Sequence, residues 1–281
     1  MELRRYREAL NLKQREAARE LEWSLSKLIR IETGAHSVSV SDLKSMIEVY
    51  RISDQGQVDA LMAAARASRG QAWWSHYREV VSPTFARYLG YEASAGSFRI
   101  FHPFLVPGLL QTEEYATELL KLLPDQKVAR QLVELKMDRQ ERLFAQPGLS
   151  FTFIAGEEAL FREIGGRQVM QRQLAHLASV ADRGNAELRI VPFDVGAYPG
   201  LIGPLILLRL VESGEDVSFV ESMAGDQLIR DDPEIISRHA EYFENMIDIS
   251  FPPERTEALL RERIERLRRA EDPNADGAGT R

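Results

Sequence analysis

Several side chains in this sequence could do chemistry, but their spacing does not assemble a catalytic or metal centre. The adjacent carboxylates Glu157 and Glu158 would point in different directions on a helix, so they do not form a carboxylate pair. The five histidines share no metal-ligand spacing, and no serine-nucleophile, metalloprotease or phosphate-loop motif occurs. Without cysteine, thiolate metal sites and a cysteine nucleophile are excluded. We therefore predict that the protein is not an enzyme, and we expect no cofactor and no bound metal.

Another set of polar side chains has the spacing needed to contact DNA. Ser26, Lys27 and Arg30 fall on the outward face of an expected helix that begins at Ser24 and ends before Gly34. Arg30 is long enough to reach a guanine edge with two hydrogen bonds. Ser24 and Lys27 are better placed for backbone phosphates, which position a protein on DNA. This face therefore predicts contact with a major groove.

Three further residues belong to the same candidate DNA-binding set. Lys13 stands at the start of the preceding helix, where its charge suits a phosphate better than the helix dipole. Gln14 can bind a phosphate or brace the first residue that reads a base. Leu25 can pack on a thymine methyl or only support its helix.

The elements that must position these side chains are two short helices joined by a tight turn within residues 13–34. The apolar residues recur at three- and four-residue spacing, as in amphipathic helices; they are Ala17, Ala18 and Leu21, then Leu25, Leu28 and Ile31. This pattern predicts a helix-turn-helix. Further helices are expected at 2–10, from 41 and from 54 to 67, which gives a five-helix bundle over 1–67. Arg7 and Glu32 are placed to form a salt bridge between its first and third helices.

The sequence resembles a known family at several motifs. Leu12-x-Gln14, Glu16-Ala17-Ala18 and Arg30-Ile31-Glu32-x-Gly34 resemble the phage-repressor-like (XRE-type) DNA-binding domain. The block from Val106 to Ala116, VPGLLQTEEYA, resembles bacterial XRE regulators that carry a C-terminal domain of unknown function. The resemblance implies a transcriptional regulator that binds double-stranded DNA, often encoded beside a small partner protein that it is thought to bind.

Three positions depart from that pattern. Leu25 stands where a polar base-reading residue is common, and the other two bear on geometry. Lys13 replaces the usual Thr or Ser cap, so the second helix lacks a hydroxyl cap. Glu22 stands where the turn between the two helices usually has glycine. If its backbone is left-handed, about 1 kcal/mol of strain is stored there.

Composition and charge separate the chain into two unlike parts. Its 281 residues are 44% hydrophobic and 28% charged, which are globular values. Up to Gly70 there are 12 basic and 10 acidic residues, whereas the remainder has 24 and 33. DNA contact must therefore come from a few placed charges. No window approaches the roughly 20 apolar residues of a membrane span, so we expect a soluble, cytoplasmic protein.

Beyond a linker at 68–72, alternating strands and helices predict an α+β domain over 73–269. Expected strands are 97–102, 151–155, 187–193, 204–211 and 217–221, and a hairpin turn joins the last two. Expected helices are 113–122, 128–144, 169–181, 233–247 and 253–269. Adjacent strands beside segregated helices predict a mostly antiparallel sheet with helices on one face. Residues 270–281 are expected to be a disordered tail.

The role of this larger domain stays open between two classes. It could dock a partner protein, or it could hold a small molecule in a pocket near His102 and Tyr198. Trp73 and Trp74 could close such a pocket, or anchor the linker to the core. The first domain could also serve only as a protein-docking, antitoxin-like module. A homodimer is expected, because one helix-turn-helix reads few base pairs alone.

Overall fold

The computed structural model describes residues 2–32, 38, 40–67, 73–180, 183–211, 213–222 and 224–269. Within helices, the side chains of residues 2, 30, 40, 60 and 63–67 are not among those described. The predicted linker 68–72 and tail 270–281 lie outside the described residues. The chain divides into two compact units, Met1–His76 and Tyr77–Arg281, and each is described by itself.

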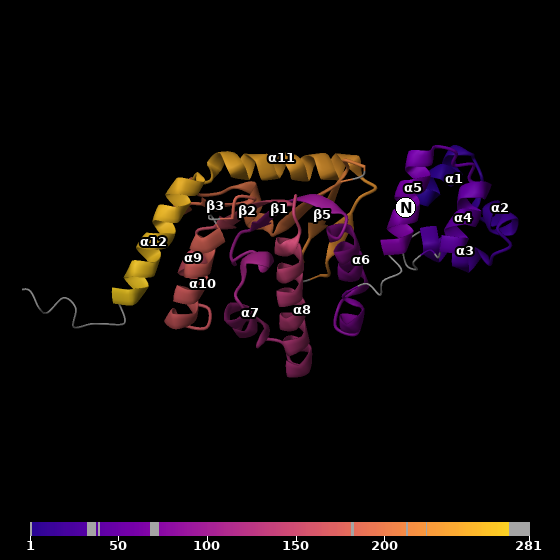
Figure 1. Cartoon of the computed structure of the whole chain (residues 1–281). Helices are drawn as coiled ribbons and strands as arrows, with labels where there is room; N and C mark the ends of the chain where they lie inside the picture. The colour runs from indigo at the N-terminus through magenta and orange to yellow at the C-terminus, as the bar shows by residue number, and fades with distance from the viewer. Residues whose placement is uncertain are drawn as a thin grey trace, which may run out of the picture. The chain divides into compact units, whose positions relative to one another are not determined.

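The N-terminal unit is helical (Figure 1). Its helices are α1 (Glu2–Ala9), α2 (Gln14–Glu20), α3 (Leu25–Glu32), α4 (Val40–Val49) and α5 (Gln55–Ala67). Their apolar faces meet in one core, in which Ala17, Leu28, Leu43 and Met46 are almost fully buried. Because apolar burial is the main driving force for a unit of this size, this core fixes how α2 and α3 cross.

The second unit is built on a mixed sheet whose order, among the described residues, is β3-β2-β1-β4-β5-β6. The strands are β1 (Ala95–His102), β2 (Ser150–Gly156), β3 (Ala186–Val191), β4 (Leu205–Leu210), β5 (Asp216–Val220) and β6 (Gln227–Ile229). The predicted β4–β5 hairpin is confirmed, because these strands pair antiparallel. β6 was not expected from the sequence.

The predicted mostly antiparallel sheet is wrong. β1 pairs parallel with β2, and β2 pairs parallel with β3, whereas β4, β5 and β6 continue the sheet antiparallel on the other side of β1. The reason lies in the connections. Each of the first two strands is followed by a helical crossover, and a crossover returns the chain to run parallel.

Helices cover both faces of the sheet, so the prediction of helices on one face is also wrong (Figure 1). They are α6 (Pro83–Glu92), α7 (Glu113–Leu120), α8 (Gln126–Ala145), α9 (Glu158–Phe161), α10 (Arg167–Val180), α11 (Pro233–Ile249) and α12 (Pro253–Arg269). α11 packs Phe243 and Met246 on one face, against Phe101 and other core residues. The opposite face carries Phe151, which contacts Phe144 of α8.

A buried ion pair holds α6 to α8. Arg139 donates to both carboxylate oxygens of Glu92, at 3.2 and 2.6 Å, and also to the hydroxyl of Tyr88. The Glu92 side chain is 3% exposed, so the pair is stable only because both charges are matched. Among the described residues, no helix is long and apolar enough to cross a membrane.

Candidate nucleic-acid interface

The turn between α2 and α3 is formed by backbone hydrogen bonds. The N–H of Trp23 donates to the carbonyl of Ala18 at 2.8 Å, and that of Glu22 donates to Arg19 at 3.1 Å. These bonds satisfy the last carbonyls of α2, as in a Schellman motif. Glu22 has φ +57°, so the condition stated for this position is met and the strain that a side chain brings to a left-handed backbone is present there.

The start of each helix is capped in a different way. The hydroxyl of Ser24 accepts from the N–H of Lys27 at 3.2 Å, which confirms that α3 begins with this cap. At α2, the N–H of Lys13 donates to the carboxylate of Glu16 at 2.8 Å. The glutamate therefore supplies half of a capping box although the hydroxyl is missing, and the exposed Lys13 side chain is not used as a cap.

The outward face of α3 carries exposed residues next to a buried stripe. Leu28 and Ile31 are buried, whereas Ser26 is exposed and Ile29 is 37% exposed. Leu25 is half-buried and packs against the core, which favours the supporting role over a thymine contact. Arg30 lies within α3, but its side chain is not among those described.

Lys27 lies in an intramolecular clamp instead of extending freely from α3. Its ammonium donates to Asp42 of α4 at 2.8 Å and lies 4.0 Å from the centre of the Trp23 ring. Its side chain is 34% exposed and that of Asp42 is 26% exposed. A pair this accessible contributes about 1 kcal/mol or less, so a phosphate can compete with Asp42 for the ammonium.

Gln14 belongs to a buried network that fixes α3 in the bundle. Its amide donates to Glu32 at 3.0 Å, while Arg7 donates to both oxygens of the same carboxylate at 2.7 and 3.0 Å. The hydroxyl of Tyr50 donates to it as well, at 3.0 Å. The predicted salt bridge between Arg7 and Glu32 is thus confirmed. Gln14 braces α3 through Glu32, which the sequence did not reveal.

The network also sets the protonation of its central carboxylate. Burial by itself would raise the pKa of Glu32, but the hydrogen bonds from Arg7 and Gln14 and the charge of Arg7 outweigh it, so the pKa is lowered from 4.5. Glu32 is therefore ionised at neutral pH. Residues of α1, α2 and α3, together with Tyr50 after α4, meet at this one charge.

The weaker candidates of the larger domain do not form one pocket. Trp73 and Trp74 contact each other edge-to-face at 5.7 Å and belong to the N-terminal unit. Phe101 and His102 are consecutive in β1, so their side chains point to opposite faces of the sheet. Tyr198 lies against Phe101 on the α11 face. His102 and Tyr198 are therefore on different faces.

His102 has a structural role at the end of β1. Its Nδ1 accepts from the N–H groups of Phe104 and Leu105, at 3.2 and 3.0 Å. Burial and the positive charge of Lys136 lower its pKa to about 4. The ring is therefore neutral at pH 7. The buried hydroxyl of Tyr198 has no hydrogen-bond partner among the described residues.

The VPGLLQT segment is held by side chains from two helices and by its own Gln111. Gln140 of α8 donates to the carbonyls of Gly108 and Gln111, and Gln173 of α10 donates to that of Leu110. The buried Gln111 amide donates to Val106. These bonds satisfy the loop's buried carbonyls, which would otherwise be costly. The contacts of this motif are thus structural.

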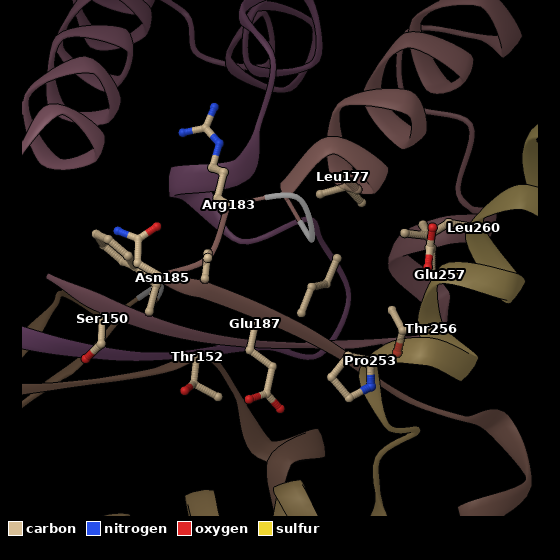
Figure 2. A pocket seen from close by; sticks show the side chains of 14 residues that line it. Ser150, Thr152, Leu177, Arg183, Asn185, Glu187, Pro253, Thr256, Glu257 and Leu260 are labelled. Carbon is tan, nitrogen blue, oxygen red and sulfur yellow. The ribbon is translucent and has the colours of Figure 1, made fainter.

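A groove that the sequence did not indicate lies along the edge of β3 (Figure 2). Its volume is about 520 Å³. The lining comes from the starts of β2 and β3, the turn before β3, the end of α10 and the start of α12; it includes Arg183, Asn185, Leu188, Pro253 and Leu260. None of the predicted site residues lines it.

The helix order, the tight turn and the exposed face of α3 define a helix-turn-helix protein. A helix-turn-helix domain model matches residues 1–61. A model described as a domain of unknown function (DUF5753) matches residues 85–262. Because this second match spans more than half of the chain, the protein belongs to the DUF5753 family. Comparisons with curated proteins and with solved structures gave no match.

Proposed function

We propose that this protein is a sequence-specific DNA-binding transcriptional regulator that places α3 in the major groove. The observation that carries the proposal is the division of α3 into a buried stripe and an exposed face that begins at the Ser24 cap. The matching helix-turn-helix model supports it. Ser26 and Arg30 would contact bases, and Lys13, Ser24 and Lys27 would contact phosphates.

The finer features of the proposal follow the sequence resemblance. The helices α1–α5 would form a repressor-like bundle of the XRE type, and the protein would act as a cytoplasmic homodimer on a two-fold site. The DUF5753 domain would have no catalytic role. It would change DNA affinity when a partner binds. Part of the outer edge of β3 carries no neighbouring strand in the described chain, which favours a protein partner over a small ligand.

Selection of binding sites from random duplexes, with the full chain, tests the DNA-binding proposal. Arg30→Ala should weaken binding to the selected site by about 1–3 kcal/mol and relax one base position. Arg130→Ala is the matched control, because Arg130 is exposed on α8 in the other unit. Failure to enrich any sequence, or equal effects of both variants, would contradict the proposal.

A further inference from the structure

β3 is the last strand on its side of the sheet, and most of its outer edge carries no neighbouring strand in the described chain. One bridge interrupts this edge: Phe251 pairs antiparallel with Ile190, and its N–H donates to the carbonyl of Ile190 at 2.7 Å. The next residues, Pro252 and Pro253, lead into α12. Because proline has no N–H and cannot continue a strand ladder, the pairing stops there.

The backbone groups that face outward can be assigned from the hydrogen bonds of the sheet. On the β2 side, the carbonyls of Asn185 and Val191 accept from Phe151 and Glu157. On the outer side, the carbonyl of Ile190 accepts from Phe251. Successive residues of a strand direct their N–H and C=O groups to opposite edges. Leu188 is two residues before Ile190, so its N–H and C=O both point to the outer edge.

The groove lies where the interrupted strand would have continued. It extends beside Ala186 and Leu188, and it is bounded by the turn Arg183–Asn185 at one end and by Pro253 at the other (Figure 2). The open stretch of edge is about three residues long, or roughly 10 Å at the rise of a strand. This bounded space suits one extended segment and not the sheet edge of a second copy.

We propose that the β3 groove binds an extended segment of a partner protein, which adds to β3 as a short antiparallel strand. The inference rests on the proposed function in one respect, namely that the DUF5753 domain docks a protein partner. Edge addition of this kind draws its affinity from backbone hydrogen bonds and its specificity from alternate side chains.

The two sides of the groove specify which side chains the segment carries. On the side of α10 and α12, the lining includes Leu177 and Leu260. Glu187 and Thr152 point to the other face of the sheet (Figure 2). The Glu187 carboxylate pairs with Arg189 on that face but keeps a side-chain exposure of 38%, so a basic side chain of the segment could share it. The segment should therefore alternate apolar residues with basic ones. The segment residue opposite Leu188 would exchange both backbone hydrogen bonds with Leu188, because the N–H and C=O of Leu188 point outward. The side chain of this residue would lie on the same face as that of Leu188, so it should be apolar.

A fluorescein-labelled peptide of alternating valine and lysine, Val-Lys-Val-Lys-Val-Lys, is the probe; its central residues would occupy the open stretch, and its ends would leave the edge of β3. Its fluorescence anisotropy is followed while the full chain is added without DNA. We expect saturable binding. N-methylation of the valine amides should weaken it about 10-fold or more, because these N–H groups face β3. N-methylation of the lysine amides should leave it unchanged, because these N–H groups face solvent.

Two charge variants test the side-chain assignment. Glu187→Lys should weaken binding about 3-fold, as expected for a partly exposed charge contact that Arg189 already shares. Glu241→Lys makes the same change of net charge at an exposed position on α11 and should have no effect.

No saturation up to about 1 mM peptide, or equal binding of the two N-methylated isomers, would overturn the inference. Equal binding would show only attraction to the acidic chain. Because DNA is absent from this titration, a negative result leaves the DNA-binding proposal intact, and failure of the DNA selection does not alter the peptide result.

Discussion

Glu32→Gln should remove much of the stability of the N-terminal unit. Four hydrogen bonds converge on this carboxylate, two from Arg7 and one each from Gln14 and Tyr50. The Glu32 side chain is 0% exposed and that of Arg7 is 6% exposed. Whichever way the new amide is oriented, its NH₂ group faces two former donors. The buried charge of Arg7 keeps only the carbonyl of Leu12 and the half-exposed carboxylate of Glu8, which lies 3.6 Å away.

The magnitude follows from these contacts. Breaking a buried pair by neutralising one partner costs about 3–5 kcal/mol. At roughly 0.05–0.15 kcal/mol per residue, a unit that ends at His76 has a stability of about 4–11 kcal/mol. The substitution should therefore leave the unit marginally folded, and DNA binding should weaken in parallel.

Urea unfolding followed by tryptophan fluorescence measures this effect selectively. The three tryptophans, Trp23, Trp73 and Trp74, all belong to the N-terminal unit, so the signal reports on that unit alone. Glu48→Gln is the matched control, because Glu48 is exposed on α4. The double variant Arg7→Met with Glu32→Leu should recover much of the stability, because apolar replacements of a buried pair are often tolerated.

The pH dependence provides a second test. Because the pKa of Glu32 is lowered in the folded unit, the unfolded chain takes up this proton at higher pH than the folded one. The contribution of ionised Glu32 to the stability of the N-terminal unit is therefore complete above about pH 4.5. It is lost as pH falls through the pKa that Glu32 has in the folded unit. The difference in the free energy of unfolding between wild type and Glu32→Gln should become smaller as pH falls below about 4.5. A Glu32→Gln effect below about 1 kcal/mol at pH 7, or one independent of pH, would refute the reasoning.

Three further substitutions test other contacts. Lys27→Gln should make the dependence of log DNA affinity on log salt shallower by about 0.9, because the phosphate contact proposed for this lysine is lost. Anisotropy titrations at several salt concentrations measure the slope, and an unchanged slope would show that this lysine does not reach a phosphate. Glu22→Gly should stabilise the N-terminal unit by up to about 1 kcal/mol, because glycine relieves the strain of the left-handed backbone. The greater entropy of the unfolded chain with glycine offsets part of this gain. A lower urea midpoint than that of the wild type would contradict the prediction. Arg139→Met should destabilise the second unit by about 3–5 kcal/mol by leaving Glu92 buried and unpaired, which calorimetry can detect; an unshifted transition would mean that Glu92 relaxes into water.

The local features of the helix-turn-helix could be predicted because each depends on residues close in sequence. The Ser24 cap and the left-handed Glu22 follow from hydrogen-bonding groups and backbone conformations within one turn. The clamp of Lys27 was missed because Asp42 lies 15 residues away. For the same reason, the sequence left two roles open for Gln14, because its partner Glu32 is 18 residues away.

In the sheet too, features set by neighbouring residues could be predicted, and features set by distant residues could not. Strand positions follow from short apolar runs, but the pairing direction depends on where each chain segment returns. The helices between β1 and β2, and between β2 and β3, were predicted, and their presence was a usable signal for parallel pairing. The β3 groove gave no such signal, because it depends on Pro252 and Pro253 lying beside a strand that ends some 60 residues earlier.

The position of β1 in the sheet has a consequence for synthesis on the ribosome. Its two neighbours, β2 and β4, begin at Ser150 and Leu205, so its ladders form only after most of the chain has emerged. The N-terminal unit ends at His76 and is helical, and such local contacts form fast. At about 5–20 residues per second, the stretch from His76 to the end of β5 at Val220 takes roughly 7–30 s. During that interval, a nascent chain would carry a folded helix-turn-helix without the domain proposed to control it.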